Sequence, residues 1–232
     1  MRKIVIICQG RTGSTNLSDF YKKKYKIRNL GEIFRNKDYV NDPDSLIQEL
    51  ANKKNWIVKL IPIQVLHAAF ASFLKKKYPV TSFNNKMRIF QHIENFRNSG
   101  TNYSYYLEHK QEIFQEAIDI CLKIINLSDH HCYLCRKDFI GQIKSLVSAD
   151  ISQEFGPNRA KEKVYVPEEL ITSTRNSLIK TYELIKEIYI RSPNDIIFTE
   201  SLTVGKKYNP ITLKSNSVSL DDYDVGKEVF NI

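Results

Sequence analysis

Long apolar runs are missing from this 232-residue chain. No stretch approaches the roughly 20 residues that a membrane-spanning helix needs, so we expect no transmembrane segment. The amino-terminal apolar run is too short for a signal peptide, and it leads directly into a glycine loop, which predicts a strand. Internal repeats and low-complexity segments are also lacking, so we expect residues 1–232 to form a single domain.

The chain also has few residues in metal-binding patterns. Cys132 and Cys135 form its one C-x-x-C, and no second cysteine pair completes a zinc site. The segment His131–Cys135 is typical of a buried strand, in which the two cysteine side chains would point to opposite faces. We therefore expect structural thiols and no bound metal. Reduced cysteines without a leader favour a cytoplasmic location.

The stretch Lys3–Leu17 reads KIVIICQGRTGSTNL, a short apolar run followed at once by two glycines. This pattern predicts a strand, a tight loop and a helix. Backbone N–H groups of such a loop and of the helix start can bind an anion. Arg11 adds a planar, permanently charged donor group suited to phosphate or sulfate. The segment therefore predicts a site for the phosphate end of a nucleotide, although two glycines could also serve only to turn a strand into a helix.

Two common nucleotide loops are excluded. The ATPase type needs four residues between its glycines and then Gly-Lys-Ser/Thr, whereas two residues separate Gly10 from Gly13 and no lysine follows. The dinucleotide fingerprint needs a third glycine three residues further on, where this chain has Asn16.

The formal net charge is +9, which favours an anionic ligand such as a nucleotide, an acidic glycan, a nucleic acid or a membrane surface. The lysine runs at 22–24 and 75–77 are equally consistent with solvated helix ends.

Short apolar runs alternate with longer amphipathic stretches along the chain. This alternation predicts an α/β fold with three layers, in which helices flank a central, mainly parallel sheet. The expected strands are Lys3–Cys8, Lys26–Leu30, Trp56–Leu60, His131–Cys135 and Asp195–Phe198. The expected helices are Thr15–Lys24, Pro43–Lys53, Ile63–Lys76, Tyr103–Asn126, Phe139–Ser152 and Pro167–Arg191.

Two regions fall outside this alternation. Residues 81–126 are rich in aromatics and are predicted to be a helical insertion on the acceptor side, with Phe90, Phe96 and Phe114 in the core. The cluster at 102–106 near Gly100 is a candidate for lining a substrate cleft. Residues 203–232 are turn-rich and polar, and we expect an irregular carboxyl-terminal tail that packs back over the sheet.

A second anion-binding pattern follows the fourth predicted strand. That strand ends in Arg136, Lys137 and Asp138, and Ser145 lies two turns into the next helix. A basic residue at the strand end and a hydroxyl on the helix could converge on one phosphate. Either Arg136 or Lys137 could be that basic residue.

Together the two segments resemble the sulfotransferases that use 3′-phosphoadenosine 5′-phosphosulfate (PAPS), particularly the bacterial carbohydrate type. The loop Gln9–Thr15 is similar to the element that binds the 5′-phosphosulfate in that family. Cys135–Asp138 with Ser145 is similar to the element that binds the 3′-phosphate. The segment Asn29–Phe34 resembles the family's Gly-Glu-x-Phe, and Phe198–Leu202 its Tyr-Glu-x-Leu. Strand Trp56–Leu60 resembles a third strand that commonly ends near a lysine, here Lys59.

The resemblance implies a sulfotransferase with a P-loop-type fold that moves a sulfuryl group from PAPS to a hydroxyl, in a carbohydrate or glycolipid. It implies no metal and no nucleic-acid partner. Arg11 and Glu32 would be catalytic, with Glu32 as the base and His67, His92 and His109 as alternatives. The residues implied to bind PAPS are Gly10, Arg11, Thr12, Gly13, Ser14, Thr15, Arg136 and Ser145.

The chain departs from the family at several points. Many members carry lysine at the position of Arg11 and tryptophan at that of Asn16, and the Arg-Lys-Gly loop of the cytosolic enzymes is absent. Two other functions stay open. One is a nucleotide kinase or NTPase with a degenerate phosphate loop, which would depend on magnesium. The other is a non-catalytic polyanion-binding protein with strongly salt-dependent affinity.

Overall fold

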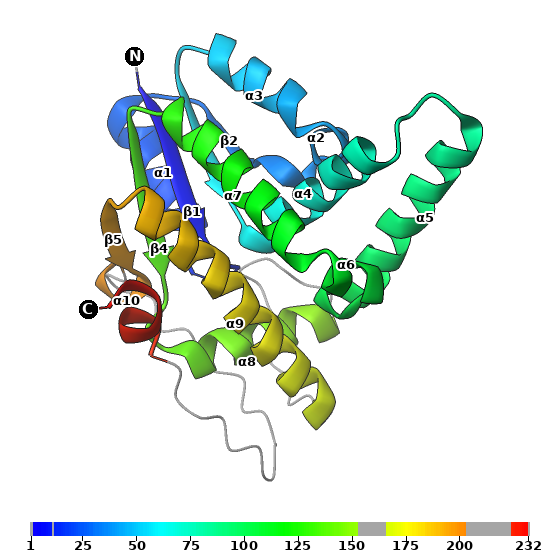
Figure 1. The fold of residues 1–232 in the computed structure, drawn as a ribbon. Coiled ribbons are helices and arrows are strands. Elements are labelled where there is room, and N and C mark those ends of the chain that lie inside the picture. The colour runs from blue at the N-terminus through cyan, green and yellow to red at the C-terminus, as the bar shows by residue number, and fades with distance from the viewer. Residues whose placement is uncertain (1, 11, 153–165, 203–223, 232) are drawn as a thin grey trace.

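The computed structural model describes residues 2–10, 12–152, 166–202 and 224–231. In this part of the chain, five strands form one sheet in the order β2–β3–β1–β4–β5, and all neighbouring strands run parallel (Figure 1). The strands are β1 (Lys3–Cys8), β2 (Asn29–Glu32), β3 (Trp56–Leu60), β4 (His130–Cys135) and β5 (Asp195–Phe198). The expected α/β class with a parallel sheet is confirmed.

Helices of very different length connect these strands. The longer ones are α1 (Ser14–Tyr25), α3 (Pro43–Asn52), α4 (Pro62–Lys77), α5 (Phe83–Ser99), α7 (Lys110–Asn126), α8 (Phe139–Ser152) and α9 (Glu168–Arg191). The short ones are α2 (Lys37–Asn41), α6 (Ser104–Glu108), α10 (Thr199–Leu202), and the single turns η1 (Ile33–Arg35), η2 (Gly100–Asn102) and η3 (Gly226–Phe230).

The central strand β1 is almost completely buried. Residues 4–8 are at most 1% exposed, because parallel strands in this position are covered on both faces and read as one continuous apolar run. Ile4, Ile6 and Cys8 pack on the side that α1 covers, whereas Val5 and Ile7 point to the opposite layer.

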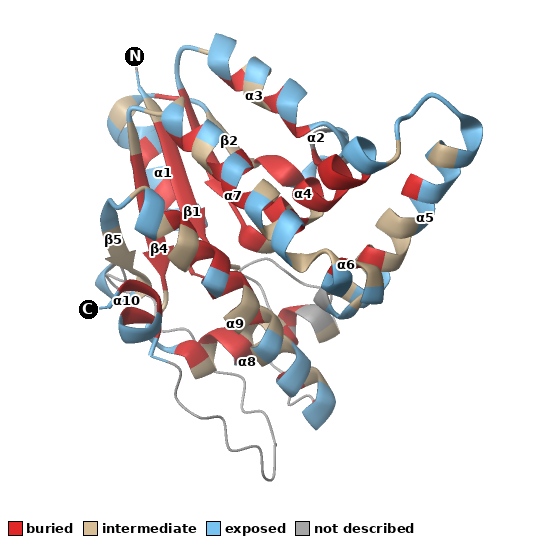
Figure 2. Ribbon diagram, viewed as in Figure 1, coloured by how far each residue is buried: buried red, intermediate tan, exposed pale blue. Residues whose placement is uncertain are grey.

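The two faces of the sheet are covered unequally in the described part of the chain. Helix α1 packs Leu17 and Tyr21 on one face. Helices α3, α4, α7 and α9 bury apolar side chains over the other, and Figure 2 shows the buried strands between these layers. Helix α7 belongs to this second layer, because Ile113, Cys121 and Ile124 are fully buried in it.

Three expectations need correction. Strand β2 begins three residues later than predicted, because α1 ends at Lys26 in a left-handed conformation (φ 52°). The predicted helix 103–126 is broken at His109, whose N–H bonds to the carbonyls of Tyr105 and Tyr106. Phe90, expected in the core, is 59% exposed.

Residues 81–126 were expected to be a helical insertion, but α5 was not predicted as a separate helix with its own bounds, for a physical reason. Its apolar residues lie on two faces: Ile89 and Phe96 are buried, while Phe83, Met87 and Phe90 face outward. Sequence periodicity detects helices with one apolar face, so a helix with two weak faces gives little signal.

The tail prediction is only partly covered by the structure. Residues 203–223 lie outside the described part of the chain. The described end of the tail packs on the sheet layer, where the Phe230 ring centroid lies 6.1 Å from that of Tyr133 and 5.0 Å from that of Tyr189. Among the described helices, none is both long and apolar enough to cross a membrane.

Candidate functional site

The site residues predicted from sequence gather at the carboxyl edge of the sheet. From β1 the chain proceeds toward β2 and β3, and from β4 it proceeds the other way, to β5. Neighbouring strands β1 and β4 therefore form a topological switch point. In open α/β sheets, ligands bind in the crevice outside such a point.

The glycine loop after β1 ends in a left-handed residue. Gly13, at the N-cap of α1, has φ 76°, a conformation that side chains disfavour. No hydrogen bond from a described side chain caps the start of α1, and Thr15 is exposed there. Ser14 is buried close to the Cys8 thiol. Arg11 lies outside the described residues.

Buried polar contacts hold this loop in place from three directions. The Thr12 hydroxyl donates to the carbonyl of Gln9 at 2.8 Å. The Thr199 hydroxyl lies 2.6 Å from the Thr12 carbonyl and 2.9 Å from that of Cys135, so it joins the loop to the end of β4. The Gln9 amide donates to the Thr181 hydroxyl on α9.

Helix α8 also packs directly against the loop. The Gln142 side-chain amide donates to the Gly10 carbonyl at 2.8 Å and accepts from the Tyr182 hydroxyl at 3.0 Å. One turn later, Leu146 lies so close that a Cβ on Gly10 would meet its Cδ2 at 3.3 Å. The face of α8 that carries Gln142 and Leu146 is therefore fixed on the loop.

The second predicted segment, after β4, is a clamped turn. Asp138 caps α8, since its Oδ1 accepts from the N–H of Gly141 at 2.8 Å. Its Oδ2 accepts from Arg136 Nη2, also at 2.8 Å. The carboxylate of Glu200 accepts from the N–H groups of Lys137 and Asp138 at 3.2 and 3.1 Å.

The turn separates its two basic side chains. Lys137 Nζ lies 4.6 Å from the ring centroid of Phe198, over β5. Arg136 lies over the first turn of α8, where its Nη2 is 2.6 Å from the position that a Cβ on Gly141 would occupy. Ser145 follows Gly141 by four residues, so the two positions are neighbours on the helix surface. Arg136 and Ser145 therefore lie along the same side of α8.

Glu32 ends β2 opposite Lys59 in the register of β2 with β3. Its Oε1 lies 3.6 Å from Lys59 Nζ, and its Oε2 accepts from the Gln64 amide at 2.9 Å. The Gln64 Oε1 is buried, and it has no hydrogen-bond partner among the described residues.

Burial raises the pKa of the Cys8 thiol to about 12, and the charges of Lys59 and Glu32 also act on it. Glu32 therefore lies within electrostatic reach of the end of β1.

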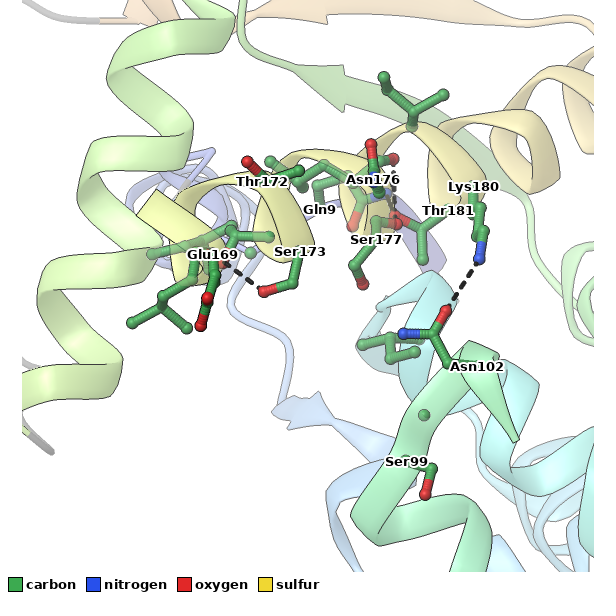
Figure 3. A pocket seen from close by; sticks show the side chains of 18 of the residues that line it. Gln9, Ser99, Asn102, Glu169, Thr172, Ser173, Asn176, Ser177, Lys180 and Thr181 are labelled. Atoms are coloured by element: carbon green, nitrogen blue, oxygen red, sulfur yellow. Dashed lines mark hydrogen bonds between the residues drawn. The ribbon is translucent and has the colours of Figure 1, made fainter. Parts of the chain in front are cut away.

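A cleft of about 1200 Å³ opens beside the glycine loop. Gln9 and Gly10 form one part of its wall, α9 a second and the end of α5 with η2 a third (Figure 3). Lys180 Nζ donates across it to Asn102 Oδ1 at 3.4 Å. Figure 3 shows a hydroxyl- and amide-rich wall, formed by Thr172, Ser173, Asn176, Ser177 and Thr181 of α9 and by Ser99 and Asn102.

Some of the site residues predicted from the sequence line this cleft, and others do not. Gly10 and Asn102 line it, while Tyr106, from the same aromatic cluster, is buried in the core. Glu32, Arg136 and Ser145 are not among its lining residues.

Sequence reasoning missed the residues that hold the loop. Gln142, Thr181 and Gln9 are polar yet at most 3% exposed. A glutamine in the apolar face of the helix Phe139–Ser152 was the available signal, because a buried amide needs hydrogen-bond partners. Thr199 gave no signal, because its partners lie more than 60 residues away along the chain.

The cysteines lie as predicted. Cys132 packs in the α1 layer and Cys135 in the opposite one. Burial raises the pKa of both thiols, to about 12 for Cys132. In the described part of the chain, no group of three or more His, Cys, Asp or Glu side chains could hold a metal ion.

Comparison of the chain with protein-family models, with curated proteins and with solved structures finds no match in any of the three.

Proposed function

We propose that the protein is a PAPS-dependent sulfotransferase that acts on a hydroxyl acceptor, a carbohydrate or glycolipid. The observation that carries the proposal is the arrangement at the switch point between β1 and β4. Helix α8 is bonded to the glycine loop through Gln142, and the same helix carries Ser145 beside Arg136. One edge of the sheet thus carries both candidate anion-binding elements, as a donor with phosphate groups at both ends would require.

The two elements would divide the donor between them. The start of α1 after Gly13, together with Thr12, Ser14, Thr15 and Arg11, would hold the 5′-phosphosulfate, because uncapped helix N–H groups and a guanidinium favour an anion. Arg136 and Ser145 would hold the 3′-phosphate. We favour Arg136 over Lys137 because the Lys137 side chain lies on the Phe198 ring, away from α8.

The reaction forms a bond between the acceptor oxygen and the sulfuryl sulfur, and breaks the bond from that sulfur to the 5′-phosphate oxygen. The loop would stabilise the charge that develops on the leaving phosphate. Glu32 would accept the acceptor's proton. Its carboxylate keeps lone pairs beyond those used by Lys59 and Gln64, and its side chain is 32% exposed. The hydroxyl-lined cleft beside Gly10 does not include Glu32, so it would hold a part of the acceptor remote from the reacting hydroxyl.

A thermal-shift panel tests the donor assignment. At about 100 times its Kd, adenosine 3′,5′-bisphosphate should raise the Tm by about 5–10 °C, because a ligand that binds only the folded state stabilises it. ATP with magnesium should raise the Tm much less. The variants R11A, R136A and S145A should each lose most of the bisphosphate shift.

Two controls separate the roles. Arg191→Ala removes one guanidinium at the end of α9, just before β5 begins. This position lies at the amino edge of the sheet, opposite to the carboxyl edge that carries the predicted site, so the variant should keep the full bisphosphate shift in Tm. Glu32→Gln should also keep it, while slowing transfer of labelled sulfate to sugar acceptors. Equal protection by magnesium ATP would favour the nucleotide kinase instead, and would contradict the proposal.

A further inference from the structure

Helix α5 presents an apolar stripe to solvent. We define the α5 stripe as Val80, in the turn before the helix, with Phe83, Met87 and Phe90. These side chains are 44%, 75%, 50% and 59% exposed. The last three follow the spacing i, i+4, i+7, so they lie along one side of the helix. The stripe is thus a continuous surface and not a set of scattered apolar residues.

The stripe lies at the outer end of a hairpin. Helix α5 starts away from the body of the molecule and returns to it near α6 (Figure 1). Its inner end is fixed by Phe96, whose ring centroid lies 4.6 Å from that of Phe70 on α4. Figure 2 shows that the outer half of the helix is mostly exposed, whereas the inner half is mostly of intermediate exposure; the buried positions are Ile89 in the outer half and Phe96 in the inner half. The stripe can therefore meet a large partner without displacing the core.

Basic residues are frequent along the α4–α5 hairpin that carries the stripe. Residues 75–97 contain six basic residues and one acidic residue. The basic residues are Lys75, Lys76, Lys77, Lys86, Arg88 and Arg97. The acidic residue, Glu94, pairs with Arg97. From the neighbouring α7, Glu116 pairs with Lys76 at 2.5 Å, and its side chain is less exposed than that of the lysine.

We propose that the α4–α5 hairpin docks on an anionic lipid surface. Phe83, Met87 and Phe90 would enter the headgroup region, and the surrounding lysine and arginine side chains would contact lipid phosphates. A helix with phenylalanines on one side and basic residues beside them has the chemistry of interfacial helices. A second copy of the chain fits less well, because a symmetric contact would bring the same basic residues against each other.

This proposal does not depend on the sulfotransferase assignment, because no residue of the hairpin's outer half belongs to the anion-binding elements. It predicts that the full chain sediments with vesicles of phosphatidylcholine containing about one-third phosphatidylglycerol, and not with phosphatidylcholine alone. Raising the salt should weaken the binding, since the Debye length falls from about 8 Å at 0.15 M to about 3 Å at 1 M.

Matched variants locate the contact. The triple variant F83S/M87S/F90S should reduce the vesicle partition coefficient by tenfold or more, whereas F20S/I190S, which removes two equally exposed apolar side chains elsewhere, should leave it unchanged. K75Q/K76Q/K77Q should reduce it by roughly tenfold to a hundredfold. K22Q/K23Q/K24Q removes the same charge from the end of α1 and should have a small effect.

Three results would overturn the proposal. The first is the absence of any preference for anionic vesicles. The second is an equal loss of binding in the stripe variant and its control. The third is a concentration-dependent dimer that the stripe variant abolishes while vesicle binding is absent, which would assign the stripe to a contact between two copies. Circular dichroism of each variant confirms that the fold is kept.

Discussion

Gly141 provides space that two charged side chains use. A Cβ at this position would lie 1.9 Å from Asp138 Oδ2 and 2.6 Å from Arg136 Nη2. Alanine is ordinarily favoured over glycine within a helix by about 1 kcal/mol. Here the methyl group must displace the Asp138 cap, the Arg136 contact or both, so local packing opposes the helix propensity.

We therefore expect Gly141→Ala to lose at least half of the thermal shift given by adenosine 3′,5′-bisphosphate, with no gain in the free energy of unfolding. The thermal shift measures the effect on bisphosphate binding. Urea unfolding of the free protein measures the effect on stability. A fully retained shift would show that the position of Arg136 does not depend on this space.

At the scale of elements, Gln142 is the link between three of them. It joins α8 to the glycine loop at Gly10 and to α9 at Tyr182, and it is fully buried. Replacing it with methionine keeps the volume but leaves the Gly10 carbonyl and the Tyr182 hydroxyl without this partner. An unsatisfied buried polar group costs about 1–3 kcal/mol.

Gln142→Met should therefore lower the free energy of unfolding in urea by about 2–4 kcal/mol and weaken bisphosphate binding. Gln91→Met, on the exposed side of α5, serves as the matched control and should stay within about 0.5 kcal/mol of the wild type. If both variants were equally stable, the hydrogen bonds of Gln142 would not hold α8 on the loop.

The contact between α4 and α5 should respond to acid through His67. Its ring centroid lies 4.8 Å from that of Phe96, and burial, together with the charge of Arg97, lowers the pKa of His67 from 6.5 to about 4. A lowered pKa means that the unfolded chain takes up the proton first. The stabilising effect is therefore full above pH 6.5 and is lost as the pH falls toward 4.

We expect His67 to account for a loss of about 2 kcal/mol in unfolding free energy between pH 7 and pH 5. His67→Phe keeps an aromatic ring against Phe96 but cannot titrate, so its stability should fall less over this range. Urea unfolding at pH 7, 6 and 5 provides the comparison. The pH dependence of the unfolding free energy that remains in this variant would come partly from His92 and His130, whose pKa values burial also lowers. An identical slope in the variant would contradict the assignment.

Sequence patterns predicted most elements of the sheet and its covering helices, because the central strands are largely apolar runs and most of the helices have one apolar face. Strands β1, β3 and β5 and helix α8 begin and end at the predicted residues. Helix α5 lies in a region that was expected to be helical, but its bounds were not predicted, because its apolar residues are divided between two faces. The two candidate anion-binding segments could be proposed because each is contiguous in sequence. The contacts of Thr199 and Gln142 could not, since they depend on how distant segments fold together.

At the scale of the whole molecule, two groups of basic residues have different surroundings. Arg136 at the carboxyl edge is partly covered and held by Asp138, whereas Lys75 and Lys86 on the hairpin lie in open solvent. Bonded, partly covered guanidinium groups suit a small ligand of defined shape. Freely exposed ammonium groups beside apolar side chains suit an extended surface. These two groups of basic residues thus suit different kinds of anionic ligand.

The central place of β1 has a consequence during synthesis. Its partners are β3 on one side and β4 on the other, so β1 is synthesised more than 100 residues before its second neighbour. At about 5–20 residues per second, the nascent chain would carry KIVIIC without its second neighbour for roughly 6–25 s. During that interval this apolar segment is a natural target for a chaperone.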